Sequence, residues 1–339
     1  MEQPYDAILL VSFGGPEGMD EVMPFLRNVL RGRNVPEARM REVARHYELF
    51  GGVSPINEQN RRLIRALGQE LGERGPRLPV YWGNRNWHPL LADTLRKMRD
   101  EGVGRALAFV TSAYSSYSGC RQYREDIERA RAEVGEGAPR ADKLRAFFNH
   151  PGFVGPNAER VRAALAEIPE GRRGRAELAF TAHSIPAAMA AGCDYVSQLN
   201  ETCRLVAGAA GHASWRLVFQ SRSGPPTQPW LEPDILDHLR RLKEGGARDV
   251  VVSPVGFISD HMEVIYDLDT EARRTADELG LNLVRAATVG THPVFVSMIR
   301  ELIVERLDPA APRRALGLFP PRADACAVDC CPPAARPTP

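Results

Sequence analysis

The sequence predicts an α/β fold in which parallel β-sheets are flanked by helices. Short apolar runs recur along the chain, at residues 7–13, 79–83, 106–113, 178–184, 216–221 and 250–257. Runs that are apolar throughout are typical of strands buried on both faces of a parallel sheet. Amphipathic segments separate the runs and fit the crossover helices that join parallel strands. Polar residues and glycines follow each run, where a doubly wound sheet binds its ligands, so we expect function in these loops.

The predicted elements divide into two similar Rossmann-like halves. Three strand signals precede the segment 143–154 and three follow it, so the chain is expected to cross between the halves near residue 150. We predict an N-terminal domain over 1–150, a C-terminal domain over 151–312, and an active site in the cleft between them. Residues 313–339 are rich in proline and alanine, show no periodicity, and cannot build a core of their own.

Composition argues against several functional classes. The 339 residues include 44 basic and 43 acidic side chains, giving a net charge of +1, so bulk electrostatics do not favour nucleic acid. No apolar run approaches the roughly 20 residues that span a bilayer, and the N-terminus lacks the basic region of a signal peptide. A cytoplasmic location is therefore expected. In a reducing cytosol the six cysteines are better interpreted as metal ligands or incidental thiols than as disulfides.

The segment GFISDHMEVIYDLDTE, residues 256–271, gathers five acidic residues and a histidine directly after an apolar run. A helix with Asp260 as its N-cap would place Glu263, Asp267 and Glu271 on roughly one face. Neighbouring carboxylates repel one another, and a passing cation or proton would relieve that repulsion. A solvated acidic face near a helix N-terminus explains the same spacing. The preceding strand, His261 and the interleaved apolar residues favour the wall of a site.

His183 follows another strand signal, in the segment LAFTAHSIP, where Ser184 and Pro186 predict a turn. A lone histidine at a strand end is often only a structural hydrogen-bonding group. Paired with Glu263 across the crevice, its imidazole would complete a site that binds a borderline metal or relays protons near pH 7. The pairing is a hypothesis that requires the two side chains to be neighbours.

Several segments together resemble the ferrochelatases, which insert Fe²⁺ into a porphyrin in haem synthesis. In the family's order, these segments are LLVSFGGP, HYELFGGVSPIN, AHSIP, QSRSGPPTQPWLEP and DHMEVIYDLDTE. The segments YWGNRNWHPLL and TSAYSSYSGCRQYREDI are similar to the actinobacterial-type branch, some of whose members carry an iron–sulfur cluster. The resemblance implies a lyase with two chelatase-type α/β domains that acts on a porphyrin and ferrous iron.

The resemblance also implies roles for single residues. The family's catalytic histidine falls on His183 and its partner carboxylate on Glu263. Asp267 and Glu271 correspond to outer acidic residues that accept protons or feed metal, and His261 lies in the same motif. The implied porphyrin-binding positions are Trp230, which would line the face of the macrocycle, and Phe13, Ser54, Arg85, Ser221 and Arg222.

The chemistry of metal insertion accounts for these residue types. A free-base porphyrin holds two pyrrole N–H protons that must leave before the metal is fully bound, so the site needs a base, and His183 is the candidate. Histidine and carboxylates bind Fe²⁺ and release it more readily than thiolates do. A rigid wall such as Trp230 would help to distort the ring and expose its nitrogen lone pairs.

The sequence leaves the substrate and the functional class open. The main expectation is insertion of Fe²⁺ into protoporphyrin IX to form protohaem, and the alternative is coproporphyrin III, which forms coprohaem. These porphyrins differ by two vinyl groups against two extra propionates, so basic residues at the pocket rim would decide. Candidate rim charges are Arg27, Arg31, Arg33, Arg45 and Arg85. Two hypotheses come from other functional classes: a non-catalytic carrier of haem or metal, and an iron–sulfur sensor.

The cysteines of the C-terminal segment are candidate cofactor ligands. CAVDCC supplies three thiols, one short of a four-cysteine [2Fe–2S] site, and the resemblance implies that Cys120 is the internal fourth ligand. The cluster would be structural, because metal insertion transfers no net electrons. A zinc site of four thiolates or a tail without metal are the alternatives. Cys193 and Cys203 are interpreted as packing residues. The candidate ligands are Cys120, Cys326, Cys330 and Cys331.

Assembly and membrane contact follow only from the resemblance. Some relatives form homodimers and touch membranes to collect an apolar product. The segment VMPFLRNVLRGR, residues 22–33, fits an amphipathic helix at the lip of the site, and packing against the core explains the same pattern.

Overall fold

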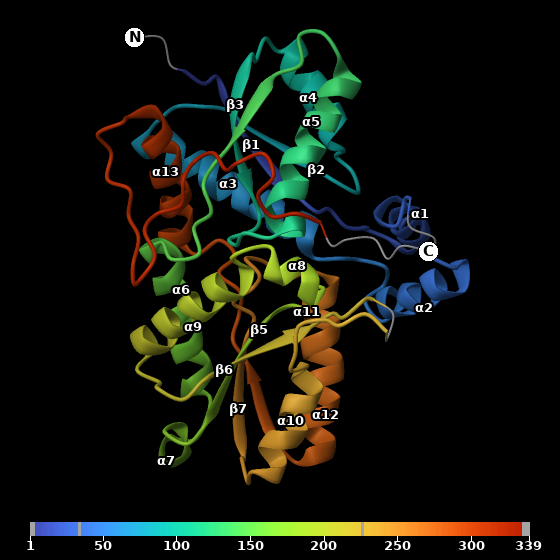
Figure 1. Ribbon diagram of the computed structural model, residues 1–339, viewed down its shortest axis with the longest axis vertical. Coiled ribbons are helices and arrows are strands. Elements are labelled where there is room, and N and C mark those ends of the chain that lie inside the picture. The colour runs from blue at the N-terminus through green and yellow to red at the C-terminus, as the bar shows by residue number, and fades with distance from the viewer. Residues whose placement is uncertain (1–3, 33–34, 225–226, 334–339) are drawn as a thin grey trace.

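The computed structural model describes residues 4–32, 35–224 and 227–333, which form two parallel four-stranded sheets (Figure 1). The first sheet has the order β2-β1-β3-β4, and the second has the order β6-β5-β7-β8, so both halves repeat one topology. The strands of the first sheet are β1 (Ala7–Ser12), β2 (Val80–Asn84), β3 (Arg105–Val110) and β4 (Arg140–Lys143). Those of the second are β5 (Glu177–His183), β6 (Arg216–Gln220), β7 (Asp249–Ser253) and β8 (Asn282–Arg285).

The predicted α/β class, with two Rossmann-like halves, is confirmed. All six apolar runs form strands, and the structure adds the short strands β4 and β8 at corresponding edges of the two sheets. The predicted domain boundary near residue 150 falls between β4 and the first helix of the second half, and the division into domains stays a prediction.

Helices cover both faces of the first sheet. Alternate residues of β1 point to opposite sides: Leu9 packs with α4 (Leu91–Asp100) and α5 (Gln122–Val134), whereas Leu10 faces α3 (Ile56–Arg74). This burial on both faces explains why β1 is apolar throughout. The other helices of this half are α1 (Met19–Val29), α2 (Glu37–Glu48) and the π-helix η1 (Tyr117–Arg121).

The second sheet is enclosed in the same way. Its inner face packs on α6 (Pro151–Ala166) and α9 (Tyr195–Ala210), and its outer face packs on α10 (Ile235–Glu244), the π-helix η2 (Asp267–Ala272) and α12 (Arg273–Leu279). The remaining helices are α7 (Glu170–Arg173), α8 (Ala187–Ala191), α11 (Met262–Tyr266) and α13 (Pro293–Leu307).

One hydrophobic core joins the two halves. Phe109 of the first sheet and Phe180 of the second belong to a single buried cluster that also contains Phe147 and Phe295. Helix α13 lies against both α3 and α6, so the last helix of the chain bridges the two halves (Figure 1). This continuous packing gives the elements at the junction a rigid support.

Helices α1 and α2 form a separate lip beside the junction (Figure 1). The apolar face of α1, with Val22 and Phe25, packs against Tyr47 of α2 and Met262 of α11. Packing against a small core therefore accounts for the amphipathic pattern of α1, and peripheral membrane contact stays a prediction. In the described part of the chain, no helix is both long and apolar enough to cross a membrane.

Candidate active site

His183 and Glu263 are neighbours at the carboxyl end of the second sheet. His183 is the last residue of β5, and Glu263 lies in the first turn of α11, which follows the loop after β7. The Nε2 atom of His183 is 3.5 Å from Oε2 of Glu263, and His183 Nδ1 contacts the carbonyl oxygen of Ser184. The pairing expected from the sequence is therefore present in the fold.

The pair is reachable by solvent although protein surrounds it. The side chains of His183 and Glu263 are 31% and 51% exposed, so a ligand could touch both. Burial opposes the charged imidazolium, but the Glu263 carboxylate outweighs burial and raises the pKa of His183 to about 9. Burial likewise opposes the carboxylate, and His183 lowers the pKa of Glu263 well below its usual range. At neutral pH the pair holds one proton, on the imidazole.

The acidic segment forms a helix that begins one residue later than expected. His261, not Asp260, occupies the N-cap position, and helix α11 starts at Met262. Asp260 instead faces Arg285, with its Oδ1 atom 3.1 Å from Nη1, and its backbone N–H donates to Gln59 Oε1 at 2.9 Å. The predicted N-cap at Asp260 is wrong, because an arginine partner holds that carboxylate.

A π-helical turn aligns the acidic side chains. Helix α11 passes directly into η2, which contains Asp267 and Glu271. Four α-helical residues turn slightly more than a full circle, whereas four residues of the wider π-helix turn slightly less. The two deviations cancel, so the backbone positions of Glu263 and Glu271 return to nearly the same face. The expected row of carboxylates therefore runs along one side of this composite helix.

Asp267 is the carboxyl group of this row whose pKa lies near neutral pH. Ser221 Oγ donates a hydrogen bond to its Oδ2 atom, and Gln220 Nε2 donates to the same oxygen at 3.3 Å. Burial is the main cause that raises the pKa of Asp267, and the Glu263 and Glu271 carboxylates raise it as well. The net pKa is about 7. A carboxyl group with this pKa can accept and release a proton near neutral pH.

His261 completes the group around Glu263. Its ring packs edge-on against Phe257, with centroids 5.0 Å apart. Burial lowers the pKa of His261, and the Glu263 carboxylate only partly offsets this effect. A neutral imidazole beside a protonated one gives the site a free nitrogen lone pair, which is the form of histidine that binds metals.

Trp230 lies beside the turn that follows His183. Its backbone pairs with Pro186 in an antiparallel bridge, and Ser184 Oγ donates to the carbonyl of Leu231 at 2.9 Å. The indole packs so closely on Gly224 that a Cβ at that glycine would lie 2.3 Å from Trp230 Nε1. Any larger residue at Gly224 would displace the indole. The close packing on Gly224 and the backbone bridge to Pro186 together hold Trp230 near the catalytic candidates.

The implied porphyrin contacts from the first half occupy three different environments. Phe13 is 37% exposed directly after β1, where its ring is available to a ligand. Ser54 is buried and packs on the glycine turn after β1, where a Cβ at Gly15 would lie 2.7 Å from Ser54 Cβ. Arg85 is also buried: it pairs with Asp126 and lies over the Tyr123 ring at 4.3 Å.

The arginines expected at the pocket rim or in contact with the porphyrin differ in whether their charge lies at the surface or inside the protein. Because Arg85 already has a buried carboxylate partner, it supplies no free charge to the rim, and its guanidinium lies 5.8 Å from the Phe13 ring. Arg222 is exposed and donates to the carbonyl of Gln228 at 3.2 Å. The other expected rim charges that the structure describes are exposed on or near the lip, at Arg27, Arg31 and Arg45, and Arg33 lies outside the described residues.

Two residues near the site were not singled out from the sequence. Gln220, at the end of β6, binds both Asp267 and the backbone carbonyl of Glu263. Tyr47 of α2 is buried, and the Glu263 carboxylate contributes to the rise in its pKa. Gln220 directly precedes Ser221, in a loop where the sequence already predicts function. Its position next to Ser221 could therefore have indicated a role in the site. Tyr47 lies in the segment HYELFGGVSPIN that carries the family resemblance, but nothing in that segment indicated its nearness to Glu263.

The cysteine-rich tail folds against α5 and η1. Arg124 donates to the carbonyl of Val328 at 2.8 Å, and Arg121 donates to that of Asp329 at 3.4 Å. Burial and the neighbouring thiols raise the pKa of Cys326, and burial and the nearby Cys120 and Cys330 raise that of Cys331 to about 12. Cys120 lines one cavity together with Cys326 and Cys330, and Cys331 is the next residue, so the candidate thiols converge from two distant segments of the chain.

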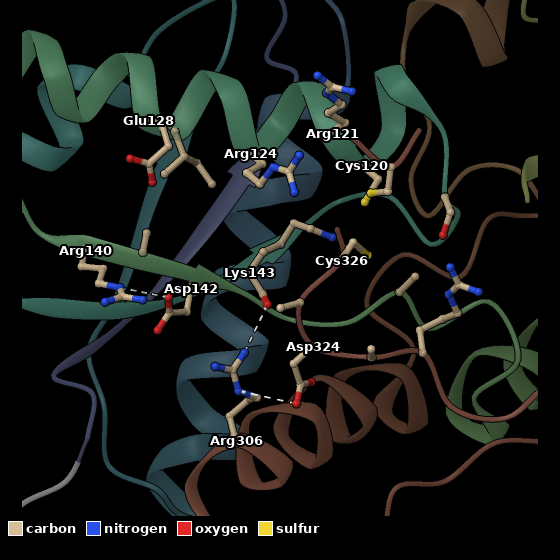
Figure 2. A pocket seen from close by; sticks show the side chains of 18 residues that line it. Cys120, Arg121, Arg124, Glu128, Arg140, Asp142, Lys143, Arg306, Asp324 and Cys326 are labelled. Carbon is tan, nitrogen blue, oxygen red and sulfur yellow. Dashed lines mark hydrogen bonds and ion pairs between the residues drawn. The ribbon is translucent and has the colours of Figure 1, made fainter. Parts of the chain in front are cut away.

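A cationic cavity of about 310 Å³ adjoins these thiols. Figure 2 shows Cys120, Cys326 and Lys143 around the same space. Three carboxylates line this cavity, against six cationic side chains: Arg121, Arg124, Arg140, Lys143, Arg306 and Arg322. An excess of positive charge beside converging thiols suits a thiolate-ligated group with negative charge. The donor set therefore fits the chemistry of a four-cysteine iron–sulfur cluster.

Two metal groups are candidates for these thiols. Within the described ranges, no group of three or more histidine, cysteine, aspartate or glutamate side chains is arranged to hold a metal ion. A zinc ion would require four thiolates around one centre, and this alternative stays a prediction, as does the cluster. The thiolates of a [2Fe–2S] cluster bind two separate irons, so they stand further apart.

Solved structures support the fold. A structure titled SirB from Bacillus subtilis with Fe³⁺ aligns with a TM-score of 0.55 at 11% identity, over 89% of this chain and 98% of that one. The sirohydrochlorin chelatase SirB in complex with cobalt aligns with a TM-score of 0.50 at 11% identity, over 90% and 94% of the two chains. At these identities the likeness concerns the architecture alone.

Sequence comparisons identify the family. The chain matches the Ferrochelatase family over residues 5–307. It is 57% identical to a ferrochelatase of Rhodopirellula baltica, over 97% of this chain and 93% of the relative. It is 54% identical to a coproporphyrin III ferrochelatase of Nocardia farcinica, over 98% of both chains, and 53% identical to one of Streptomyces griseus, over 97% and 94%. The chain therefore belongs to the ferrochelatase family of porphyrin metal chelatases.

Proposed function

We propose that this ferrochelatase inserts Fe²⁺ into coproporphyrin III, with His183 and Glu263 as its catalytic pair. The observation that carries the proposal is the 3.5 Å approach of His183 Nε2 to Glu263 Oε2 beside Asp267, a carboxyl group that titrates near neutral pH. A haem carrier would need an axial ligand for iron but no second group for proton transfer.

The residues divide the work of metal insertion between binding and proton transfer. Fe²⁺ competes with the proton that the His183–Glu263 pair holds, because a metal ligand must be deprotonated. His183 can accept a proton from a pyrrole N–H only after its own proton has passed to another group and while its Nε2 atom does not bind iron. Asp267 is placed to take that proton further along the row towards Glu271. His261, as a neutral imidazole, supplies a second nitrogen for the metal.

Coproporphyrin III has more support as the substrate than protoporphyrin IX, the main expectation from the sequence. The relatives from Nocardia farcinica and Streptomyces griseus carry the name coproporphyrin III ferrochelatase. The exposed arginines on and near the lip suit a porphyrin with two additional propionates, and Arg27, Arg31 and Arg45 are the candidates. Arg85 is excluded from this role by its buried pairing with Asp126.

We also propose that Cys120, Cys326, Cys330 and Cys331 hold a [2Fe–2S] cluster. When bound, the group would supply iron–thiolate bonds that cross-link the tail to η1. Support comes from the convergence of the four thiols and from the cationic cavity beside them. A structural role is consistent with the reaction, in which no net electrons move. A cytoplasmic location and a homodimer stay predictions.

The test follows Fe²⁺ insertion by absorbance in anaerobically purified protein, with coproporphyrin III and protoporphyrin IX in parallel. The visible spectrum is recorded first, because a [2Fe–2S] cluster absorbs before any porphyrin is added. We expect turnover of coproporphyrin III to be much the faster. Faster turnover of protoporphyrin IX would reverse the substrate assignment. Tight porphyrin binding without turnover would favour the carrier, and partner binding that depends on the cluster would favour the sensor.

A further inference from the structure

A fifth thiol lies beside the four candidate cluster ligands. Cys193 occupies the joint between α8 and α9, and both of its neighbours contact the tail. Gly192 packs so closely on Pro332 that a Cβ there would lie 3.0 Å from Pro332 Cγ. The Asp194 carboxylate lies 2.9 Å from the Arg322 guanidinium. The backbone on both sides of Cys193 is therefore held against the tail, next to Cys331.

Cys193 packs at the edge of the core and is less buried than Cys203. Its side chain is only partly buried, and its Sγ atom donates to the carbonyl of Met189 at 3.3 Å. Burial raises the pKa of Cys193, and the Cys120 thiol contributes to the rise. Cys203 is instead fully buried in the core. Both cysteines interpreted as packing residues therefore contact the core, but Cys193 is in addition partly exposed.

Cys331 is the tail ligand whose placement is most constrained. Its φ is 52°, in the left-handed region that residues other than glycine rarely adopt. Residues persist in such conformations only when surrounding interactions hold them there. The site thus combines five converging thiols, one more than a [2Fe–2S] cluster binds, with one ligand in a strained position.

We propose that Cys193 is a reserve ligand, which replaces Cys331 when the bond of Cys331 to iron is lost. The proposal rests on the proposed [2Fe–2S] cluster. In the exchange one iron–sulfur bond breaks and another forms. Cys193 releases its thiol proton and the Cys331 thiolate takes one up, so no oxidant or reductant is needed. The tail would stay attached to the body of the protein through Cys193, on α8–α9, while Cys331 is free.

The exchange is tested in the full-length protein, purified anaerobically as wild type, C193A, C331A, C326A and the double variant C193A/C331A. Alanine is used because a serine hydroxyl could itself bind iron. Iron, acid-labile sulfide and the visible spectrum are measured for each. We expect wild type and C193A to hold the cluster, and C331A to keep most of it with a shifted spectrum. The double variant and C326A should lose it, since the contact of Gly192 with Pro332 holds Cys193 beside Cys331 and not beside Cys326.

Alkylation with iodoacetamide, mapped by mass spectrometry, gives an independent readout. Cys193 should be modified in the cluster-loaded wild type and protected in C331A. Loss of iron from C331A to the level of C326A, or retention in the double variant equal to that in C331A, would overturn the proposal. If the wild-type protein contained neither iron nor sulfide, the proposed cluster itself would be wrong. This outcome is distinct from a failure of the ligand exchange alone. Far-UV circular dichroism checks that every variant is folded.

Discussion

The imidazole of His46 lies flat on the phenol ring of Tyr266, with the ring centroids 3.8 Å apart and the planes inclined by 7°. His46 belongs to α2 of the lip, and Tyr266 ends the helix that carries Glu263. Burial lowers the pKa of His46, which favours the neutral ring in the stack. The lip and the catalytic helix are thus joined by one aromatic contact, together with the packing of Met262 on Tyr47.

Removing this stack should loosen the lip over the site. We expect His46→Ala to raise the KM for porphyrin several-fold while kcat changes less, because an aromatic pair contributes about 0.5–1.5 kcal/mol. Steady-state kinetics at saturating Fe²⁺ measure the effect. Glu48→Ala, an exposed change on the same helix, is the control. Equal KM values for the two variants would show that the stack does not hold the lip.

Loss of the candidate base should stop the chemistry without preventing substrate binding. His183→Ala is expected to lower kcat by about 10²–10⁴-fold, the usual effect of general acid–base catalysis. Porphyrin binding, measured by fluorescence quenching, should persist. The matched control is His292→Ala, at the start of α13. It removes another histidine–glutamate pair, in which Nε2 of His292 lies 3.0 Å from Oε2 of Glu159. Substantial turnover by His183→Ala would remove His183 from the mechanism.

A buried ion pair should dominate the electrostatic part of stability. Arg145 Nε and Nη2 donate to the Glu305 carboxylate at 2.7 and 2.8 Å, and both side chains are 1% exposed. Arg145→Met leaves this carboxylate without its main partner, so unfolding free energy should fall by about 3–5 kcal/mol in urea titrations. Arg314→Met breaks the more exposed pair with Glu301 and should cost less than about 1 kcal/mol. Similar losses in the two variants would contradict this prediction.

The ammonium group of Lys143 should set the potential of the proposed cluster. Lys143 lies at the end of β4, lines the cationic cavity, and makes no ion pair with any residue that the structure describes (Figure 2). A nearby positive charge stabilises the reduced cluster, which is the more negative form. Lys143→Met should therefore lower the reduction potential, by on the order of tens of mV in a redox titration. Arg140→Met, whose charge already faces Asp142 at 3.3 Å, should change it less.

Most of the fold could be predicted because the central strands β1, β3, β5 and β7 are almost entirely buried and therefore largely apolar, and because β2 and β6 also carry short apolar runs. The edge strands β4 and β8 were missed: each has four residues, RADK and NLVR, and an edge position does not require a continuous apolar run. The proximity of His183 and Glu263 could be expected because both follow strands whose carboxyl ends meet at one edge of the sheet.

Other features of the site depend on tertiary contacts that no local pattern reports. The arginine at position 85 lies in a loop of the kind that binds ligands, but Asp126, 41 residues later, buries it. Cys193 sits in a helical stretch typical of packing residues, and only the folding of the tail brings Pro332 against its neighbour Gly192. Such long-range pairings are decided by the whole fold.

The pH dependence of metal insertion follows from the proton on the catalytic pair. The pKa of His183 is raised to about 9, so the imidazole is protonated at pH 7 and becomes available to Fe²⁺ only as the pH rises. Asp267, with its pKa near 7, also becomes a proton acceptor as the pH increases. We therefore expect kcat/KM for Fe²⁺, measured anaerobically, to rise from pH 6 to about pH 9 and then level off. In Glu263→Gln the carboxylate that stabilises the imidazolium is gone while burial still disfavours that charged form, so the lower maximum should be reached at lower pH. A profile that keeps its midpoint in this variant would mean that the titrating group is not His183.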